Sequence, residues 1–468
     1  METLQRPPAE TVATPADAFL QVETRGIEAI PAAERHGSPR DLGFLWAGAF
    51  ANYASLLTAS LLTTYYGLGV WDGLAATLLG TVAGALILGL LSNTGPRSGE
   101  PQIVFTRRIF GRRGSYAGAA LTLFLAIGWF AVDSVIAAQA GVQLVQLAGV
   151  ESTAAGKLLL PLVLLIAGVS AAVAVYGHAT IKVLETWGAV AFGVLALLLF
   201  AFMAPQMHWS AGPTVRGADY PGAFILGAMT CFALVASWYP FASDYSRYLP
   251  ASSAFRSVTA WPVVGVTLPL ALLGLFGLLL PTIDAKLADQ QGLLAVITAN
   301  APKAIALPFF VFVVLGEIWA NYLDVYTAGL VALTIGIRLE RWKTAIACGA
   351  LGAALAAAAV VVFDFHTFYQ DFLVLTYLWA PAWAAVVLLA LFRLGEGKPA
   401  PALVAWLVGT LASLIFVNYA NLFSNAPQLA GFHPNQGLIA ALHGADLSGA
   451  VSVVIAATAY LALRRAWR

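Results

Sequence analysis

The chain has 468 residues, of which 60% are hydrophobic and only 10% are charged, and its mean hydropathy is +0.82. Soluble domains carry roughly 25% charged residues, so a soluble globular protein, a disordered chain and a secreted disulfide scaffold are all excluded. The net charge of +1 gives no indication of a nucleic-acid partner. The composition indicates an all-α polytopic membrane protein.

Residues 1–40 are rich in proline and charge and contain no apolar run. They predict a mostly disordered cytoplasmic tail, and the missing apolar segment argues against a signal peptide. Twelve apolar windows follow, each predicted to cross the membrane as a helix. In chain order they are 43–66, 71–93, 114–148, 155–177, 179–203, 220–241, 256–281, 303–337, 342–363, 367–393, 399–423 and 440–463. Two five-helix halves, 41–203 and 220–393, therefore precede a C-terminal pair in 399–468.

The positions of the basic residues support this count. With twelve spans and both termini in the cytoplasm, 20 of the 24 Lys and Arg residues lie on the cytoplasmic side. The exceptions are Lys157, Arg216, Lys286 and Lys303. The positive-inside rule predicts this asymmetry, so we expect a multi-pass protein of the plasma (inner) membrane.

Acidic side chains lie within two spans, at Asp133 in the third and at Glu317 and Asp324 in the eighth. A carboxylate at this depth costs at least a few kcal/mol. Because no Lys or Arg lies at membrane depth, its partner must be a proton, a cation, a polar substrate or backbone donors. Glu317, Asn321 and Asp324 share one helix face, and Asp133 follows Trp129 by one turn. The alternative is that the acids stay protonated and bond neighbouring helices.

Two spans carry signs of interruption. The first has Gly48 and Asn52 among small residues, and in the sixth Pro240 removes a backbone donor close to Ser237. Breaks at matching positions of two inverted repeats indicate a transporter site at the bilayer midplane, although a simple kink is the alternative. Asp244 and Arg247, just after span six, suit a cytoplasmic gate or cap. The histidines lack metal-ligand spacing, so neither a metal centre nor a cofactor is expected.

Several stretches, taken together, resemble the purine–cytosine permease branch of the nucleobase:cation symporter family. They are VETRGIEAIPAAERHGSPRDLGFLW, GPRSGEPQIVFTRRIFGRRGSY, IGWFAVDS, YGHATIKVLETW, WYPFASDYSRYLP and DFLVLTYLWAPAWAAVVLL. They occur in order over nearly the whole chain, and WYPFASDYSRYLP is the most specific. The resemblance implies the five-plus-five inverted repeat of the leucine-transporter type, with helices 1 and 6 discontinuous and two helices added.

The resemblance also implies a substrate site between helices 1, 3, 6 and 8. By position, Trp129, Ser237, Trp238 and Asn321 would contact the substrate. In sodium-coupled relatives, helix 1 carbonyls meet oxygens of helix 8, and the matching carbonyls here are those of Gly48 and Ala51.

The chain also departs from the family pattern. Residues 317–321 stand where sodium-coupled relatives carry adjacent hydroxyl residues, and Ala126 stands where some cytosine carriers have Gln. Asp133 and Asp324 occupy positions where many purine–cytosine permeases have Asn. These departures favour either proton coupling, with Glu317 or Asp324 exchanging the proton, or a donor-rich ligand.

We therefore predict a secondary active transporter, not an enzyme, that imports a planar nucleobase-like heterocycle with a proton, or alternatively with Na⁺, by alternating access. The ring would stack on Trp129, with Trp238 or Phe232 as a second platform, while Asp133, Glu317 and Asn321 read its edge. Alternative substrates are pyridoxine, hydroxymethylpyrimidine and amide rings such as allantoin or hydantoin. An intramembrane enzyme would need a catalytic motif that the sequence lacks, and a passive channel is a further alternative.

Overall fold

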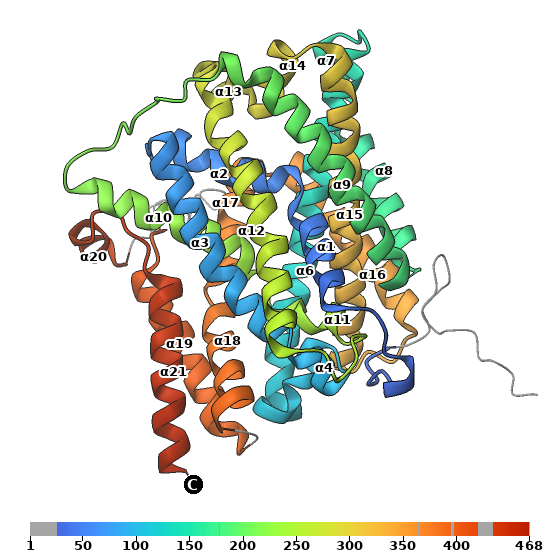
Figure 1. Ribbon diagram of the computed structural model, residues 1–468, viewed down its shortest axis with the longest axis vertical. Coiled ribbons are helices and arrows are strands. Elements are labelled where there is room, and N and C mark those ends of the chain that lie inside the picture. Colours follow the sequence, from blue (N-terminus) through green and yellow to red (C-terminus); the bar gives the residue numbers. More distant parts are fainter. Residues whose placement is uncertain (1–25, 177, 364, 395–396, 420–433, 468) are drawn as a thin grey trace, which may run out of the picture.

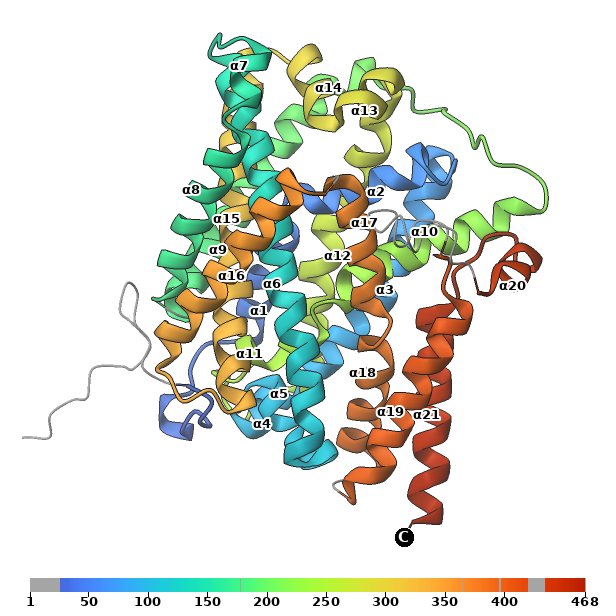
Figure 2. The ribbon, with the colours of Figure 1, turned by 180° about the vertical axis from the view of Figure 1, so that it is seen from behind.

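The computed structural model describes residues 26–467, apart from 177, 364, 395–396 and 420–433, so residues 1–25 of the predicted tail lie outside the described part. The described residues are almost entirely helical and include no β-strand. Figures 1 and 2 show long helices assembled into one bundle.

The helices follow the order expected from the apolar windows. The first half contains α1 (Pro39–Phe50), α2 (Tyr53–Thr64), α3 (Val70–Leu91), α4 (Thr94–Ser98), α5 (Gln102–Phe105), α6 (Arg107–Leu147), α7 (Ser152–Gly156), α8 (Leu159–Ala174) and α9 (His178–Met203). The second half contains α10 (Asp219–Ala236), α11 (Ala242–Ser246), α12 (Phe255–Leu279), α13 (Ala285–Gln291), α14 (Leu293–Asn300), α15 (Lys303–Ile335), α16 (Arg341–Val361), α17 (Phe365–Tyr377) and α18 (Ala380–Leu389). The C-terminal part contains α19 (Pro399–Phe416), α20 (Gln436–Ala441) and α21 (Ser448–Ala466).

Within the described residues, 10 helical segments are long and apolar enough to cross a membrane. The pair α1 and α2, bent by 61°, makes an eleventh if it is counted as one span. Helix α8, with 16 residues, lies at the predicted fourth span but is shorter than a usual spanning helix. The prediction of an all-α polytopic membrane protein is confirmed, whereas the count of twelve spans stays a prediction.

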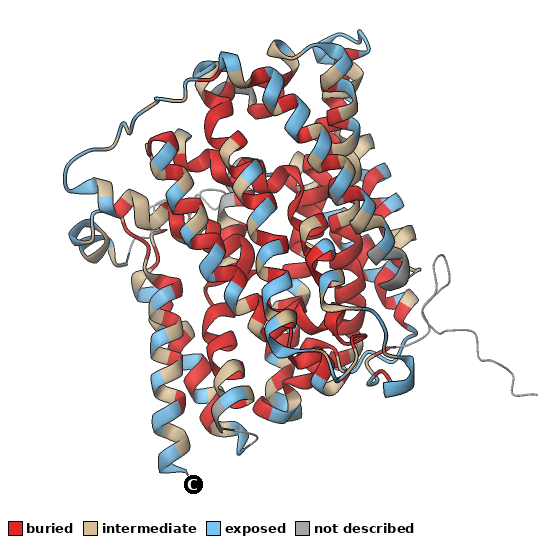
Figure 3. Cartoon of the chain, in the orientation of Figure 1, coloured by how far each residue is buried: buried red, intermediate tan, exposed pale blue. Residues whose placement is uncertain are grey.

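The outer surface of the bundle is apolar. Buried residues gather along its centre, and exposed residues lie on its outer faces (Figure 3). Large hydrophobic side chains on these outer faces are more than half exposed, such as Leu165 at 61%, Leu351 at 59% and Leu407 at 57%. A surface of this kind is unfavourable in water and favourable against lipid. The bundle is therefore built for the bilayer.

The two longest helices, α6 and α15, pack along each other at the centre of the bundle. Helix α3 packs against both α10 and α12, and α19 packs against α21. The contact of α3 with α10 depends on Gly80, because a Cβ there would clash with the Ala228 carbonyl oxygen. Small residues at such crossings let membrane helices approach closely.

Three spans are interrupted. Between α1 and α2, Ala51 departs from helical geometry at φ −82° and ψ 60°. Between α10 and α11, the chain passes through a turn at residues 237–238 and a 3₁₀ turn at Tyr239–Phe241. A third interruption at residues 378–379 separates α17 from α18. Sequence analysis did not anticipate this third break, although Pro381 in the first turn of α18 marks it.

The described N-terminal segment and the C-terminus lie at the same end of the bundle, and α7, α13 and α14 lie at the other (Figure 1). Residues 26–38 are fixed against the bundle rather than detached from it. The Ile30 amide donates to the Gly99 carbonyl at 2.9 Å, and the His36 amide donates to the Tyr248 carbonyl. Arg35 adds a bond from Nη1 to the Pro96 carbonyl at 2.8 Å. We call this the Arg35 end, and the opposite one the α14 end.

Candidate functional site

The site is built around the corner between α1 and α2, which is held by its own side chains. Asn52 caps α2 by accepting from the Ser55 amide at 3.0 Å, and its Nδ2 donates to the Ala49 carbonyl at 2.9 Å. The Ser55 hydroxyl donates to the Phe50 carbonyl at 2.7 Å. These bonds satisfy backbone groups that a broken helix would otherwise leave unpaired. The corner is therefore braced by the side chains of Asn52 and Ser55.

Glu317 of α15 lies at the start of α2. Its Oε1 accepts from the Tyr53 amide at 2.7 Å. The N-terminus of a helix carries a partial positive charge and favours a carboxylate there. The side chain is fully buried, and its Oε2 has no hydrogen-bond partner among the described residues.

Asp133 of α6 faces Glu317. The two carboxyl groups are buried neighbours, and Asp324 adds a further nearby acid. Asp133 is 2% exposed, and its Oδ1 has no hydrogen-bond partner in the described part of the chain. Two neighbouring carboxylates cannot both stay charged in a low dielectric unless something neutralises them. Such a pair therefore either shares a proton or holds a cation. The chemistry of the pair therefore suits a proton or a cation.

Trp129 lies one turn before Asp133, beneath aromatic side chains of α17. Its ring meets Phe372 at 5.3 Å and Tyr369 at 6.3 Å between centroids, edge to face in both cases. Tyr369 is held in turn by a 2.8 Å hydrogen bond between its hydroxyl and that of Thr58. The Trp129 Nε1 has no hydrogen-bond partner within the described residues. Sequence analysis missed Tyr369 and Phe372, for which the aromatic run at the start of span ten was the available signal.

Asn321, one turn after Glu317, joins three helices. Its Nδ2 donates to the Ser134 hydroxyl at 3.0 Å and to the Ser170 hydroxyl at 3.3 Å, while Oδ1 has no hydrogen-bond partner among the described residues. Asp324 lies buried on the same face, farther toward the Arg35 end. The structure therefore brings Trp129, Asp133, Glu317 and Asn321 into one neighbourhood.

The residues of the sixth span lie differently. The Ser237 hydroxyl donates to the Leu234 carbonyl within its own helix at 2.8 Å. The Trp238 ring packs edge to face on Trp46 of α1, with the two ring centroids 5.6 Å apart. Phe232 packs against Tyr239, and its ring lies beside Gly449 of α21. The structure does not bring Phe232 to Trp129 and Asp133.

The carbonyls of Gly48 and Ala51, expected from the sequence as cation ligands, lie in different surroundings. The Gly48 carbonyl accepts from the Ala51 amide at 3.1 Å, as part of α1. The Ala51 carbonyl lies at the corner and faces α15, where a Cβ added to Gly316 would lie 3.7 Å from it. Gly316 itself supplies no hydroxyl opposite this carbonyl.

A buried network closes the Arg35 end. Asp244 accepts from the Gln102 amide at 2.8 Å and from the Thr327 hydroxyl at 3.0 Å. Arg247 donates to the Gly26 carbonyl at 3.0 Å and to the Tyr326 hydroxyl at 2.9 Å. These bonds connect α11 and its C-cap residue Arg247 to the start of α5, to α15 and to the N-terminal segment. The network therefore fills the Arg35 end with bonded polar side chains.

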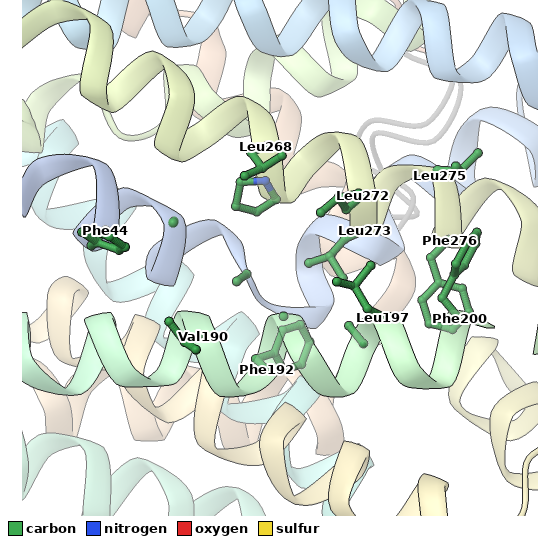
Figure 4. A pocket seen from close by; sticks show the side chains of 15 residues that line it. Phe44, Val190, Phe192, Leu197, Phe200, Leu268, Leu272, Leu273, Leu275 and Phe276 are labelled. Carbon is green, nitrogen blue, oxygen red and sulfur yellow. The ribbon is translucent and has the colours of Figure 1, made fainter. Parts of the chain in front are cut away.

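An apolar groove of about 220 Å³ lies on the other side of α1. It is walled by α9 and α12 (Figure 4), and all of its lining residues are apolar. Several of them, including Leu268 at 57% and Val190 at 50%, are exposed on the outer face. A polar ligand would find no hydrogen-bond partner from a side chain there, so the groove suits lipid hydrocarbon instead.

Residues 29–401 match the family of permeases for cytosine and purines, uracil, thiamine and allantoin. The chain belongs to this permease family. The match covers most of the sequence and confirms the resemblance inferred from its motifs. The family consists of permeases rather than enzymes.

Curated relatives of the permease are moderately similar. A putative purine–cytosine permease of Bacillus subtilis is 28% identical over 323 residues, which cover 66% of this chain and 64% of that protein. A vitamin B6 transporter of Saccharomyces cerevisiae is 23% identical over 381 residues, covering 77% of this chain and 64% of that protein. The permease thus spans somewhat less than two thirds of the length of these relatives.

Solved transporters share the fold of the permease. Mhp1, a nucleobase-cation-symport-1 family transporter in a closed conformation with bromovinylhydantoin bound, has a TM-score of 0.69 at 14% identity, with 97% of this chain and 95% of that chain covered. A Na⁺-coupled sialic acid symporter has a TM-score of 0.61 at 12% identity, covering 93% and 91%. These neighbours confirm the predicted leucine-transporter type of fold.

Proposed function

We propose that the permease is a secondary active transporter that imports a planar heterocycle of the cytosine and purine class together with a proton. The observation that carries this proposal is the buried pair Asp133 and Glu317, placed at the corner of helix 1 and one turn from Trp129. A carboxyl pair in this position joins a proton site to a surface on which a flat ring can stack.

The unpartnered atoms of the site indicate the kind of ligand. Asp133 Oδ1, Glu317 Oε2 and Asn321 Oδ1 are buried acceptors, and each costs about 1–3 kcal/mol while it stays unpaired. Trp129 Nε1 is a buried donor that also has no hydrogen-bond partner among the described residues. A ring with amino or ring N–H donors along one edge and an acceptor elsewhere would satisfy these atoms. An amino-substituted nucleobase has this pattern.

The same pair supports proton coupling. A proton shared between Asp133 and Glu317 neutralises one charge, and a donor-rich substrate edge then binds the remaining carboxylate. Asp324 would exchange the proton with the Arg35 end as the helices rearrange. A sodium site formed by Gly48 and Ala51 has less support, because Gly316 supplies no hydroxyl opposite the Ala51 carbonyl.

Uptake into proteoliposomes tests the coupling ion. We expect accumulation of radiolabelled cytosine, adenine or hypoxanthine when the outside is acidic, in the absence of sodium. A sodium gradient without a pH gradient should give no accumulation. Accumulation that requires sodium and ignores the pH gradient would overturn the proton version of the proposal.

A second substrate class has specific support. A yeast relative is a vitamin B6 transporter, and pyridoxine is also a flat ring with several donors. Competition against labelled cytosine by pyridoxine, hydroxymethylpyrimidine, allantoin and hydantoin separates the candidates. The strongest competitor that is itself taken up identifies the substrate class.

We also propose that Asp244 and Arg247 form the inner gate. Replacing Arg247 with Ala removes two hydrogen bonds from a charged donor, each worth about 1.5–3 kcal/mol. We expect the Arg35 end to open more readily, with substrate efflux from preloaded vesicles rising about tenfold and net accumulation falling. Arg112→Ala, at an exposed position on α6, is the control. Unchanged efflux in Arg247→Ala would contradict the gate.

The Arg35 end faces the cytoplasm in this proposal, and both termini lie there, in the plasma (inner) membrane. A Cys placed at Arg112 should resist a membrane-impermeant thiol reagent in intact cells. One placed at Lys157, near the α14 end, should react. The native cysteines, Cys231 and Cys348, are both buried and should not interfere. The reverse labelling pattern would invert the topology.

A further inference from the structure

A polar cavity lies at the α14 end, between α2, α6, α8 and α14. It has a volume of about 190 Å³. Its polar lining consists of the side chains of Gln139 and Gln143 and the Tyr53 side chain. Apolar side chains such as Leu57, Leu159 and Leu294 complete the walls, and none of the lining residues is charged.

The cavity lies directly outside the site. Gln139 and Gln143 follow Asp133 by six and ten residues on α6, which places them about 9 and 15 Å farther along the helix toward the α14 end. Tyr53 belongs to both places, because it lines the cavity while its amide donates to Glu317 at 2.7 Å. Tyr53 therefore connects the cavity lining to the Asp133 and Glu317 pair.

One hydrogen bond joins the cavity lining to α14. The Thr298 hydroxyl of α14 donates to Gln143 Oε1 at 2.7 Å. This bond holds α14 against α6, and Leu294 of α14 lines the cavity together with Tyr53 of α2. It leaves the Gln143 amide nitrogen available, and the side chain of Gln139 makes no hydrogen bond within the described residues.

The chemistry of this lining selects uncharged, flat, polar molecules. A carboxamide presents a donor and an acceptor side by side, which matches the amide or amidine edge of a heterocycle. Two carboxamides four residues apart lie on the same helix face and can contact one ring together. The apolar side chains can cover the faces of the ring. A free cation would find no carboxylate among these residues.

We propose that this cavity is an outer binding site for the same neutral heterocycle, occupied before the ring passes Tyr53 to reach Trp129. The inference rests on the proposed function and deepens it, since it assigns the first contact with substrate to Gln139 and Gln143. It predicts two binding sites in one chain. The outer one is weaker, because it has no counterpart of the carboxyl pair or of the Trp129 platform.

Equilibrium binding to the purified full chain tests the inference, with whichever of labelled cytosine, adenine and hypoxanthine is taken up best. The wild type should bind two molecules per chain, one tightly and one weakly. The double variant Gln139→Leu with Gln143→Leu should keep the tight site and lose the weak one. Trp129→Ala should weaken the tight site and spare the other.

The control is Gln146→Leu, on the same helix but outside the cavity lining, which should retain both sites. Thermal unfolding checks that each variant is folded. One molecule per chain in the wild type, or two in the double variant, would overturn the outer site while leaving the proposed function intact. No binding of any of the three compounds by the wild type would overturn the proposed function itself, and the outer site with it.

Discussion

Replacing Glu317 with Gln is expected to separate substrate binding from proton-driven accumulation. The amide oxygen of Gln can still accept from the Tyr53 amide, so the corner of helix 1 keeps its contact with α15. The side chain can no longer take up or release a proton. Accumulation driven by a pH gradient should fall at least tenfold, which corresponds to about 1.4 kcal/mol, whereas exchange of labelled for unlabelled substrate should continue.

The companion variant Asp133→Asn replaces a carboxylate, which only accepts hydrogen bonds, by a carboxamide, which has one acceptor oxygen and one donor NH₂ group. We expect it to weaken binding of a donor-rich ring as well as coupling. Glu340→Gln, in the exposed loop between α15 and α16, changes the same chemical group outside the membrane and should behave as the wild type. If uptake were unchanged in both Glu317→Gln and Asp133→Asn, the pair would be structural only, and the proposed mechanism would be wrong.

Replacing Trp129 with Ala is expected to produce the largest loss of binding. Stacking of a base on an aromatic side chain is worth about 1–3 kcal/mol, so the dissociation constant should rise by roughly five- to 150-fold. Trp129→Phe keeps a stacking surface and should recover much of the affinity. Measurement of labelled heterocycle bound to purified protein gives these constants directly.

The matched control is Trp187→Ala. Trp187 lies on α9 and is 72% exposed, so it faces lipid and should not contribute to binding. Trp129 packs on Phe372 and Tyr369, so thermal unfolding must show that the variant is folded. An unchanged dissociation constant in folded Trp129→Ala would exclude stacking at this position.

The spans and the acids were predictable because both depend on local pattern. Apolar windows define membrane helices whatever their neighbours are, and the spacing of Glu317, Asn321 and Asp324 fixes their shared face on α15. Sequence analysis also found the corner of helix 1, because Asn52 interrupts a run of small residues. What these residues would contact was not visible in the pattern.

The remaining parts of the site depend on contacts between distant segments. The Tyr53 amide is a backbone donor, and every residue except proline carries one, so no residue type marks its contact with Glu317. Ser134 and Ser170 become partners of Asn321 only when α6, α8 and α15 are packed together. Phe232 was a plausible second platform by its place in span six, but the packing of α10 directs its ring toward Gly449. Helix phase alone does not reveal such a direction.

The corner between α1 and α2 has a mechanical consequence. Asn52 and Ser55 bond backbone groups on both sides of the bend, and Glu317 of α15 accepts from the Tyr53 amide, so the bend is braced both from within and by α15. In the proposed alternating-access cycle, a bend braced in this way would tilt as one unit, and Glu317, which bonds the start of α2, would stay aligned with it. Flexibility would then come chiefly from the break at residues 237–238, because at residues 378–379 the Leu378 and Trp379 carbonyls accept from Ser413 and Trp406 of α19.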